Sequence, residues 1–261
     1  MTIHKSEDLL RARAKVLKLH GMLAHWDEIS ETGWIESLIQ WEEQERARRG
    51  LERRLKSARL GRFKPLADFD WSWPGQCDRE AVNDLMQLNF LDQATNVILV
   101  GPNGVGKSTI ARNIAHQAVL QGHSVLFIGA SQMLNELAAQ DGDSALKRRL
   151  AKYARPHLLA IDEVGYLSYS NRHADLLFEI VSRRYEQRST LITTNRPFQE
   201  WSDVFPNAAC VVSLVDRLVH HSEIINIEGE SYRLKEAKEH RQRQAANRRR
   251  RKTTRKKEVA A

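Results

Sequence analysis

The fold is decided by one stretch of the chain, Asn96-Val-Ile-Leu-Val-Gly101-Pro-Asn-Gly104-Val-Gly106-Lys107-Ser108. Its apolar beginning predicts a buried strand, and residues 108–121 predict a helix. The part from Gly101 matches the pattern G-x4-G-K-[ST], whose glycines permit a tight loop with backbone N–H groups directed at phosphate oxygens. A glycine-rich turn with an incidental Lys-Ser pair is the alternative, and the flanking strand and helix weigh against it. We therefore expect a phosphate-binding loop made of Gly101, Pro102, Asn103, Gly104, Val105, Gly106, Lys107, Ser108 and Thr109.

The second half of a phosphate site is expected at the end of another apolar run, Leu158-Leu-Ala-Ile161, which Asp162 and Glu163 follow directly. An acid pair after a strand is, in isolation, more often the start of a helix. Downstream of a phosphate loop, Asp162 is instead expected to bind Mg²⁺ together with Ser108, directly or through water. Glu163 is then placed to polarise the water that attacks the γ-phosphate.

Short apolar runs alternate with helical stretches from residue 78 onward, which predicts a parallel sheet with helices on both faces. The expected strands are Val97–Val100, Val125–Ile128, Leu158–Ile161, Leu191–Thr193 and Ile224–Ile227. One of them, Val125–Ile128, lies in the chain between the phosphate loop and the acid pair, which leaves room for a strand inserted between the two phosphate-site strands. The expected fold class is therefore α/β, a three-layer αβα P-loop NTPase of the additional-strand, catalytic-glutamate type. The chain has no N-K-x-D motif for guanine, so ATP is the expected nucleotide.

Three further polar residues are candidates for the same site. Asn195 follows the strand Leu191–Thr193 and would lie beside the acid-bearing strand, where it could orient the lytic water, although Asn before Arg-Pro is also an ordinary turn residue. Arg217 and Arg233 lie downstream, and solvated surface charge is the usual role of such arginines. Their spacing alone assigns them no function.

The net charge of +8 is unevenly distributed. Ten Lys or Arg lie between Arg241 and Lys257, whereas residues 1–240 carry 31 basic and 32 acidic groups. This tail is too polar to fold alone, so residues 239–261 are expected to form a disordered polybasic tail that adds sequence-independent affinity for DNA. A role in solubility or targeting is the alternative.

Several motifs together resemble one family, the IstB-like AAA+ ATPases, which are helper subunits of an insertion-sequence transposition system related to DnaC-type helicase loaders. The resemblance covers roughly residues 5–236. It rests on the phosphate loop, Asp162-Glu163-Val-Gly-Tyr166-Leu, Thr193-Thr-Asn195, Asp216-Arg217-Leu-Val-His-His and Gly229-Glu-Ser-Tyr-Arg-Leu-Lys235. Ser108 stands where Thr is commoner, and either residue supplies a hydroxyl.

The resemblance implies a role for each matching residue. Asn195 corresponds to sensor 1, Arg217 to the arginine finger that acts on a neighbouring subunit, and Arg233 to sensor 2. Such helpers assemble on duplex DNA when ATP is bound, deform it, present it to a DDE-type transposase and disassemble after hydrolysis. The resemblance thus implies a homo-oligomer with shared ATP sites, and a DnaC-type helicase loader is the alternative.

Two basic segments are candidates for contact with DNA. The stretch from Arg46 to Lys64 holds nine Lys or Arg and one acid, and it is the stronger candidate. A solvated helix face, or pairing with Glu42, Glu43 and Glu45, is the alternative for a charge run of this kind. The candidate residues are Arg46, Arg48, Arg49, Arg53, Arg54, Lys56, Arg59 and Arg62, with Lys147, Arg148 and Arg149 as a weaker second group.

The expected organisation is an α-helical DNA-binding and assembly domain over residues 1–66, an AAA+ ATPase domain over 67–238, and the tail. Trp34 and Trp41 are expected in the core of the helical domain, and Trp71 and Trp73 either pack the linker or wall an adenine pocket. His220 and His221 follow Arg217 too closely to indicate a metal site and are expected to be structural or interfacial. With two cysteines in no short-spacing motif and no apolar stretch near the ~20 residues that span a bilayer, we expect a cytoplasmic protein without a membrane partner.

Overall fold

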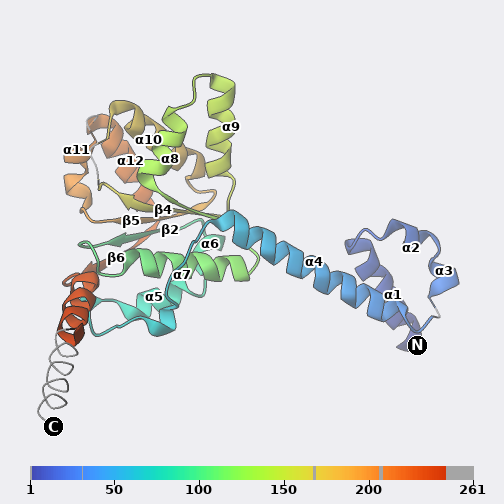
Figure 1. Cartoon of the computed structure of the whole chain (residues 1–261). Coiled ribbons are helices and arrows are strands. Elements are labelled where there is room, and N and C mark those ends of the chain that lie inside the picture. The colour runs from blue at the N-terminus through green and yellow to red at the C-terminus, as the bar shows by residue number, and fades with distance from the viewer. Residues whose placement is uncertain (1, 31, 167–168, 206–207, 245–261) are drawn as a thin grey trace, which may run out of the picture. The chain divides into compact units, whose positions relative to one another are not determined.

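The structure, a computed structural model, describes residues 2–30, 32–166, 169–205 and 208–244 (Figure 1). It divides into two compact units, Met1–Lys56 and Ser57–Ala261. Among the described residues, no helix is both long enough and apolar enough to cross a membrane.

The first unit is helical and has a small core of its own. Its helices are α1 (Thr2–Val16), α2 (His20–Ala24), α3 (Trp26–Ile29) and α4 (Ile35–Ala58), the last of which runs two residues into the second unit. The core consists of Ala14, Leu17, Trp26, Ile35 and Ile39. An ion pair of 2.7 Å between Arg13 and Glu43 joins α1 to α4.

The expected core role of Trp34 and Trp41 was wrong. Their exposed fractions are 51% and 64%, whereas Ile35 and Ile39 are 3% and 0% exposed. Ile35 and Ile39 share one face of α4. Trp41 lies on a different face of this helix, and Trp34 lies in the turn just before the helix begins. The tryptophan that fills the core is Trp26.

Residues 57–66 belong to the second unit, although the sequence had assigned them to the helical domain. The side chain of Asn113 accounts for this placement. It donates to the carbonyl of Lys64 and accepts from the backbone N–H of Leu66, at 3.0 and 2.9 Å, which fixes the segment to α7 (Lys107–Leu120).

The second unit contains a six-stranded sheet in the order β1-β6-β2-β5-β4-β3. The strands are β1 (Gln76–Cys77), β2 (Asn96–Val100), β3 (Val125–Gly129), β4 (Leu158–Val164), β5 (Ser189–Thr194) and β6 (Ser222–Glu228). All neighbours pair in parallel except β1 with β6, which confirms the predicted parallel sheet. The strand between β2 and β4 in space is β5, whereas β3 lies at the edge.

Helices cover both faces of this sheet, as the three-layer fold class requires. Figure 1 shows α7 on one face and α8, α10 and α12 on the other. The helices that follow β1 are α5 (Arg79–Leu85), α6 (Asn89–Asp92), α7, α8 (Ala130–Ala138), α9 (Asp143–Ala154), α10 (Asn171–Arg184), α11 (Trp201–Val204) and α12 (Ala208–His220), with short 3₁₀ turns at Leu66–Asp68 and Phe198–Glu200.

A further helix spans residues 232–244. Residues 239–244 are therefore helical, although the sequence had placed them in a disordered tail. The helix begins beside the phosphate loop, where Lys235 pairs with Asp70 at 3.0 Å and Glu236 with Lys64 at 2.7 Å. The rest of the expected tail, residues 245–261, lies outside the described residues.

Candidate functional site

A cavity of about 480 Å³ opens over the phosphate loop, at the carboxyl ends of the central strands. Its wall is formed by the loop itself, residues 62–74, the start of the helix over 232–244, and residues at the ends of β4 and β5. The carboxyl ends of parallel strands meet at one edge of a sheet, and β5 lies between β2 and β4. Polar residues near or just beyond the ends of these three strands therefore reach the same place.

Two glycines of the loop are required by its geometry. Gly104 and Gly106 have φ of 84° and 103°, a region that side chains rarely allow. A Cβ at Gly106 would lie 2.5 Å from the ring of Phe69, and one at Gly104 would collide with Ser231. The loop is thus packed closely by chain segments on both sides, and only glycine fits there.

Lys107 begins α7 and is 8% exposed. Its ammonium group donates to the carbonyl oxygens of Gly101 and Pro102, at 2.6 and 2.7 Å. Burial lowers the pKa of Lys107 to about 8, although the nearby carboxylates of Asp162 and Glu163 act in the opposite direction. At neutral pH the side chain is still mostly charged and lies at the positive end of a helix, which suits an anion such as phosphate.

Asp162 connects β4 to the phosphate loop. Its Oδ1 accepts hydrogen bonds from the hydroxyls of Ser108, at 2.8 Å, and Thr193, at 2.5 Å. The guanidinium of Arg112 lies 3.7 Å from its Oδ2. Sequence reasoning missed Thr193 and Arg112 as members of this site; Arg112 could have been found from its position one helical turn after Ser108.

Glu163 and Asn195 both line the cavity. Glu163 has a left-handed backbone with φ of 62°, and its N–H donates to the hydroxyl of Thr193 at 2.9 Å. Asn195 follows β5, and within the described part of the chain its Oδ1 is buried without a hydrogen-bond partner. Such an orphaned acceptor is expected where a water or another ligand completes the site.

These oxygen atoms fit a magnesium ion. The Ser108 hydroxyl and the Asp162 carboxylate are hard oxygen donors of the kind Mg²⁺ uses when a nucleotide phosphate supplies further ligands. The two groups already lie in contact, at 2.8 Å. The unpartnered Asn195 Oδ1 adds an acceptor for water at the same cavity.

The two downstream arginines are placed differently. Arg233 lines the cavity. Arg217 does not appear in its wall; its guanidinium donates to Ser182 and lies over the rings of Phe178 and Tyr185, at 4.7 and 5.9 Å. The structure thus gathers the loop, the acid pair, Asn195 and Arg233, and it leaves Arg217 outside its own chain's cavity.

Aromatic side chains from residues 63–73 form part of the cavity wall. Trp73 lies in the wall with Phe69, and its indole N–H donates to the carbonyl of Glu230 at 2.9 Å. Trp71 instead packs edge-on against Phe69, with ring centroids 4.8 Å apart. Of the two tryptophans considered as an adenine wall, only Trp73 lines the cavity.

The first candidate DNA segment is largely paired on its own helix. Arg46 lies 2.5 Å from Glu42, Arg48 lies 2.8 Å from Glu45, and Arg49 lies 3.1 Å from Glu45. Arg53 and Lys56 are exposed, and no ion pair of either is found among the described residues. Pairing, the alternative for this charge run, therefore holds for its first part.

Of the remaining candidates, Arg54 lies on α4 in the first unit, and the others lie in the second unit. Arg59 is exposed. Arg62 lines the cavity over the phosphate loop, so its charge can serve a ligand in that cavity instead of DNA. Lys147, Arg148 and Arg149 lie on α9. Arg149 is 3.4 Å from Glu136, so part of this second group is also paired.

Comparisons with known proteins agree with this geometry. The family model described as IstB-like ATP binding protein matches residues 10–240. An ATP-binding protein of insertion sequence IS21 from Pseudomonas aeruginosa is 40% identical over 198 residues, covering 76% of this chain and 75% of its own. An ATP-binding protein of insertion sequence IS232 from Bacillus thuringiensis subsp. berliner is 31% identical over 236 residues, covering 87% of this chain and 94% of its own.

Solved structures show the same fold at lower identity. AMPPCP-bound DnaA from Aquifex aeolicus superposes with a TM-score of 0.55 at 19% identity, over 65% of this chain and 51% of that one. The crystal structure of DnaI superposes with a TM-score of 0.52 at 20% identity, over 64% of this chain and 92% of that one. The second unit therefore has an AAA+ fold.

Proposed function

The chain belongs to the IstB-like ATP-binding proteins, and from this membership and the geometry of the cavity we propose that it is a Mg²⁺-dependent ATPase. The observation that carries the proposal is the convergence of Lys107, Ser108, Glu163 and Asn195 on one cavity from three adjacent parallel strands, with Asp162 hydrogen-bonded to Ser108 beside it.

Each group has a distinct part in the proposed reaction. The loop N–H groups and Lys107 bind the β- and γ-phosphates, and Ser108 and Asp162 hold Mg²⁺. When bound, Mg²⁺ neutralises charge that develops on the phosphate oxygens. Asn195 orients the attacking water, Glu163 accepts its proton, and Arg233 stabilises the γ-phosphate from the other wall of the cavity.

We further propose that the ATP site is shared between subunits of a homo-oligomer. Arg217 lies outside its own chain's cavity, on the surface formed with Tyr185 and Phe178. An arginine finger that acts on a neighbour must lie outside its own site, so this position supports the role.

We propose that the assembly binds duplex DNA in the cytoplasm. The oligomer deforms this DNA and presents it to a DDE-type transposase, and ATP hydrolysis then releases the DNA. The relatives named as ATP-binding proteins of insertion sequences support this context. The exposed cations Arg53 and Lys56 and the basic run from Arg241 supply charge for phosphate contacts. No side chain here is singled out as a base reader, so recognition would rest on phosphates and DNA shape.

The test is the ATPase rate of the full chain with and without duplex DNA. We expect duplex DNA to stimulate the rate and Lys107→Ala to abolish it, whereas Lys15→Ala, an exposed lysine of α1, keeps it. An ATPase that ignores DNA contradicts the proposed mechanism. Preference for single-stranded DNA, with co-purification of a replicative helicase, favours a helicase loader instead. A DDE-type transposase in the adjacent reading frame, and stimulation by that purified protein, would support the transposition role.

A further inference from the structure

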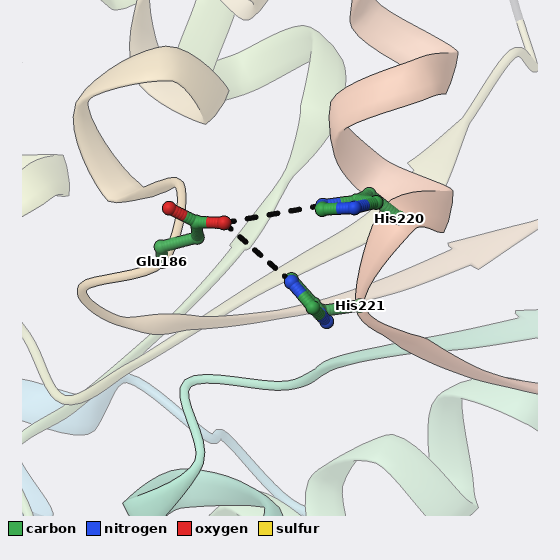
Figure 2. A group of neighbouring side chains, drawn as sticks. All are labelled: Glu186, His220 and His221. Carbon is green, nitrogen blue, oxygen red and sulfur yellow. Dashed lines mark ion pairs between the residues drawn. The ribbon is translucent and has the colours of Figure 1, made fainter.

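Glu186 meets the adjacent pair His220 and His221 on the surface of the second unit, although it lies 34 residues before His220 in the chain (Figure 2). Glu186 lies in the turn between α10 and β5, His220 ends α12, and His221 follows it. Glu186 Oε1 lies 4.0 Å from His220 Nδ1 and 3.5 Å from His221 Nε2. The three candidate ligand atoms all lie within 4.8 Å of one another.

Sequence reasoning rejected a metal site here because both histidines follow Arg217 too closely in a predicted helical run. Two features of the structure remove that objection. The helix ends at His220, so His221 has left it, and both rings approach the same carboxylate oxygen. The third ligand comes from a turn 34 residues earlier than His220, which no local spacing could indicate.

The backbone that carries the three side chains is fixed. The carbonyl of His221 accepts from the N–H of Asn96 at the start of β2, at 2.7 Å. Glu186 has a left-handed φ of 56°, and the turn that contains it closes on the carbonyl of Arg184, which accepts from Gln187 and Arg188 at 3.0 and 2.9 Å. Arg184 itself is 1% exposed.

Two imidazoles and a carboxylate are a common ligand set for Zn²⁺ and related first-row divalent ions. Ligand atoms about 2.0–2.1 Å from a tetrahedral zinc lie about 3.3 Å apart. The distance of 3.5 Å between His221 and Glu186 is close to this value, and the distance of 4.0 Å to His220 requires only a small side-chain rotation. The side chains are 53% exposed for His220 and His221 and 55% for Glu186, which leaves room for such a rotation once the Tyr185 hydroxyl releases His220 Nδ1.

We propose that Glu186, His220 and His221 bind one divalent first-row transition ion, of which Zn²⁺ is the best match, with water completing the coordination. The site is distinct from the proposed ATP site. It lies where β5 and β6 begin, whereas the cavity lies where the parallel strands end. The proposal therefore does not depend on the proposed function.

One neighbour links the metal site to the surface around Arg217. The hydroxyl of Tyr185 shares a hydrogen bond of 2.7 Å with His220 Nδ1, and the Tyr185 ring also lies 5.9 Å from the Arg217 guanidinium. A metal at His220 Nδ1 displaces the hydroxyl from that nitrogen. Tyr185→Phe removes this competitor and keeps all three ligands.

The test is titration of the untagged full chain with Zn²⁺ alone. Isothermal titration calorimetry and competition with a chromogenic chelator measure the stoichiometry and the affinity. We expect one ion per chain. His220→Ala, His221→Ala and Glu186→Gln should each weaken binding by at least about tenfold. Tyr185→Phe should bind as tightly as the wild type or more tightly. Co²⁺ should give the visible absorption bands of a tetrahedral site, and these should vanish in His221→Ala.

The matched control is His25→Ala. His25 is also exposed and lies 3.0 Å from a glutamate, Glu28, but no third ligand group joins that pair among the described residues. This variant should keep the wild-type affinity. Circular dichroism shows whether each variant is folded. If an alanine variant is unfolded, Tyr185→Phe still tests the proposal, because it keeps all three ligands and changes only the group that competes for His220. Absence of stoichiometric binding, or a His220→Ala/His221→Ala double variant that is folded and binds as the wild type does, would overturn the proposal.

Discussion

Lys107 shows how a residue that suits phosphate can be unfavourable for folding. Its ammonium group is buried beneath the loop, and burial lowers its pKa from 10.5 to about 8. One pKa unit corresponds to about 1.4 kcal/mol, so the buried charge costs roughly 3.5 kcal/mol at neutral pH when no nucleotide is bound. A bound triphosphate would offset this cost by supplying the opposite charge.

This cost has a defined pH dependence. Below pH 8 the lysine is charged in both the folded and the unfolded states, and the full cost is present. Between pH 8 and 10.5 the unfolded state binds more protons than the folded state, so the free energy of unfolding rises with pH. In urea unfolding without nucleotide, Lys107→Met should therefore be more stable than the wild type at pH 7, and the difference should shrink toward pH 10.5. Lys15→Met is the control, and parallel pH profiles for wild type and Lys107→Met would contradict the proposed burial effect.

At this scale the sequence predicted the residues that a motif identifies and missed those that only the fold brings near. The loop, Asp162 and Glu163 follow from a local pattern in the chain. Thr193 reaches Asp162 because β5 lies beside β4, and Glu186 reaches the two histidines through a turn at the other end of the sheet. Contacts between strands and turns far apart in the chain have no local signature.

Among the elements, helix α4 carries many basic residues, and some of them form ion pairs with carboxylates of the same helix. Arg46, Arg48 and Arg49 have carboxylate partners on the same helix, whereas Arg53 and Lys56 are exposed toward its end. A paired arginine must give up its partner before it neutralises a DNA phosphate, and a solvated one needs only to release counterions.

Substitutions along α4 should therefore differ in their effect on DNA affinity. Arg53→Ala with Lys56→Ala should weaken binding to duplex DNA and reduce the slope of log K against log salt by about 0.9 for each lost phosphate contact. Arg46→Ala with Arg48→Ala, the matched pair on the same helix, should change both quantities less. Fluorescence anisotropy over a range of salt concentrations measures them. An equal effect of the two pairs would contradict the assignment of the contacts to the end of α4.

The elements themselves were predictable where apolar periodicity was strong. All five predicted strands form, and the helix over α7 follows the phosphate loop. The weaker signals failed. Strand β1 has only two residues and depends on pairing with β6. The helical sequence that begins at residue 78 forms two separate helices, α5 and α6, and Leu88 before α6 has a φ of 67°. Side-chain periodicity does not report a single residue with a left-handed backbone.

At the scale of the whole molecule, the proposed ATP site needs two subunits. Lys107→Ala removes phosphate binding from a subunit's own cavity, and Arg217→Ala removes the group that the subunit offers to its neighbour. Each variant alone should hydrolyse little ATP. Mixed assemblies contain interfaces where an intact loop meets an intact arginine, so mixing should restore part of the activity. Arg183→Ala, an arginine of α10 that pairs with Glu179, should retain the wild-type rate on its own.

The mixing experiment needs proof that the two variants assemble together, for example by size exclusion with one variant labelled. Absence of any recovery despite co-assembly would contradict the trans role of Arg217. It would leave the assignment of the loop, the acid pair and Asn195 unaffected, because those residues meet within one chain.

We propose above all that ATP binding assembles the protein on duplex DNA and that hydrolysis assisted by Glu163 releases it. The most direct measurement is the dissociation rate from immobilised duplex DNA in the presence of ATP and Mg²⁺, for the wild type, Glu163→Gln and the control Glu80→Gln, an exposed residue of α5. Glu163→Gln should bind ATP and remain on DNA with a dissociation rate at least about tenfold slower, since loss of a general base costs about 10²–10⁴-fold in rate. The wild type and Glu80→Gln should dissociate as ATP is consumed. Equal dissociation of all three proteins, with ATP bound in each, would show a nucleotide-dependent scaffold and contradict the account.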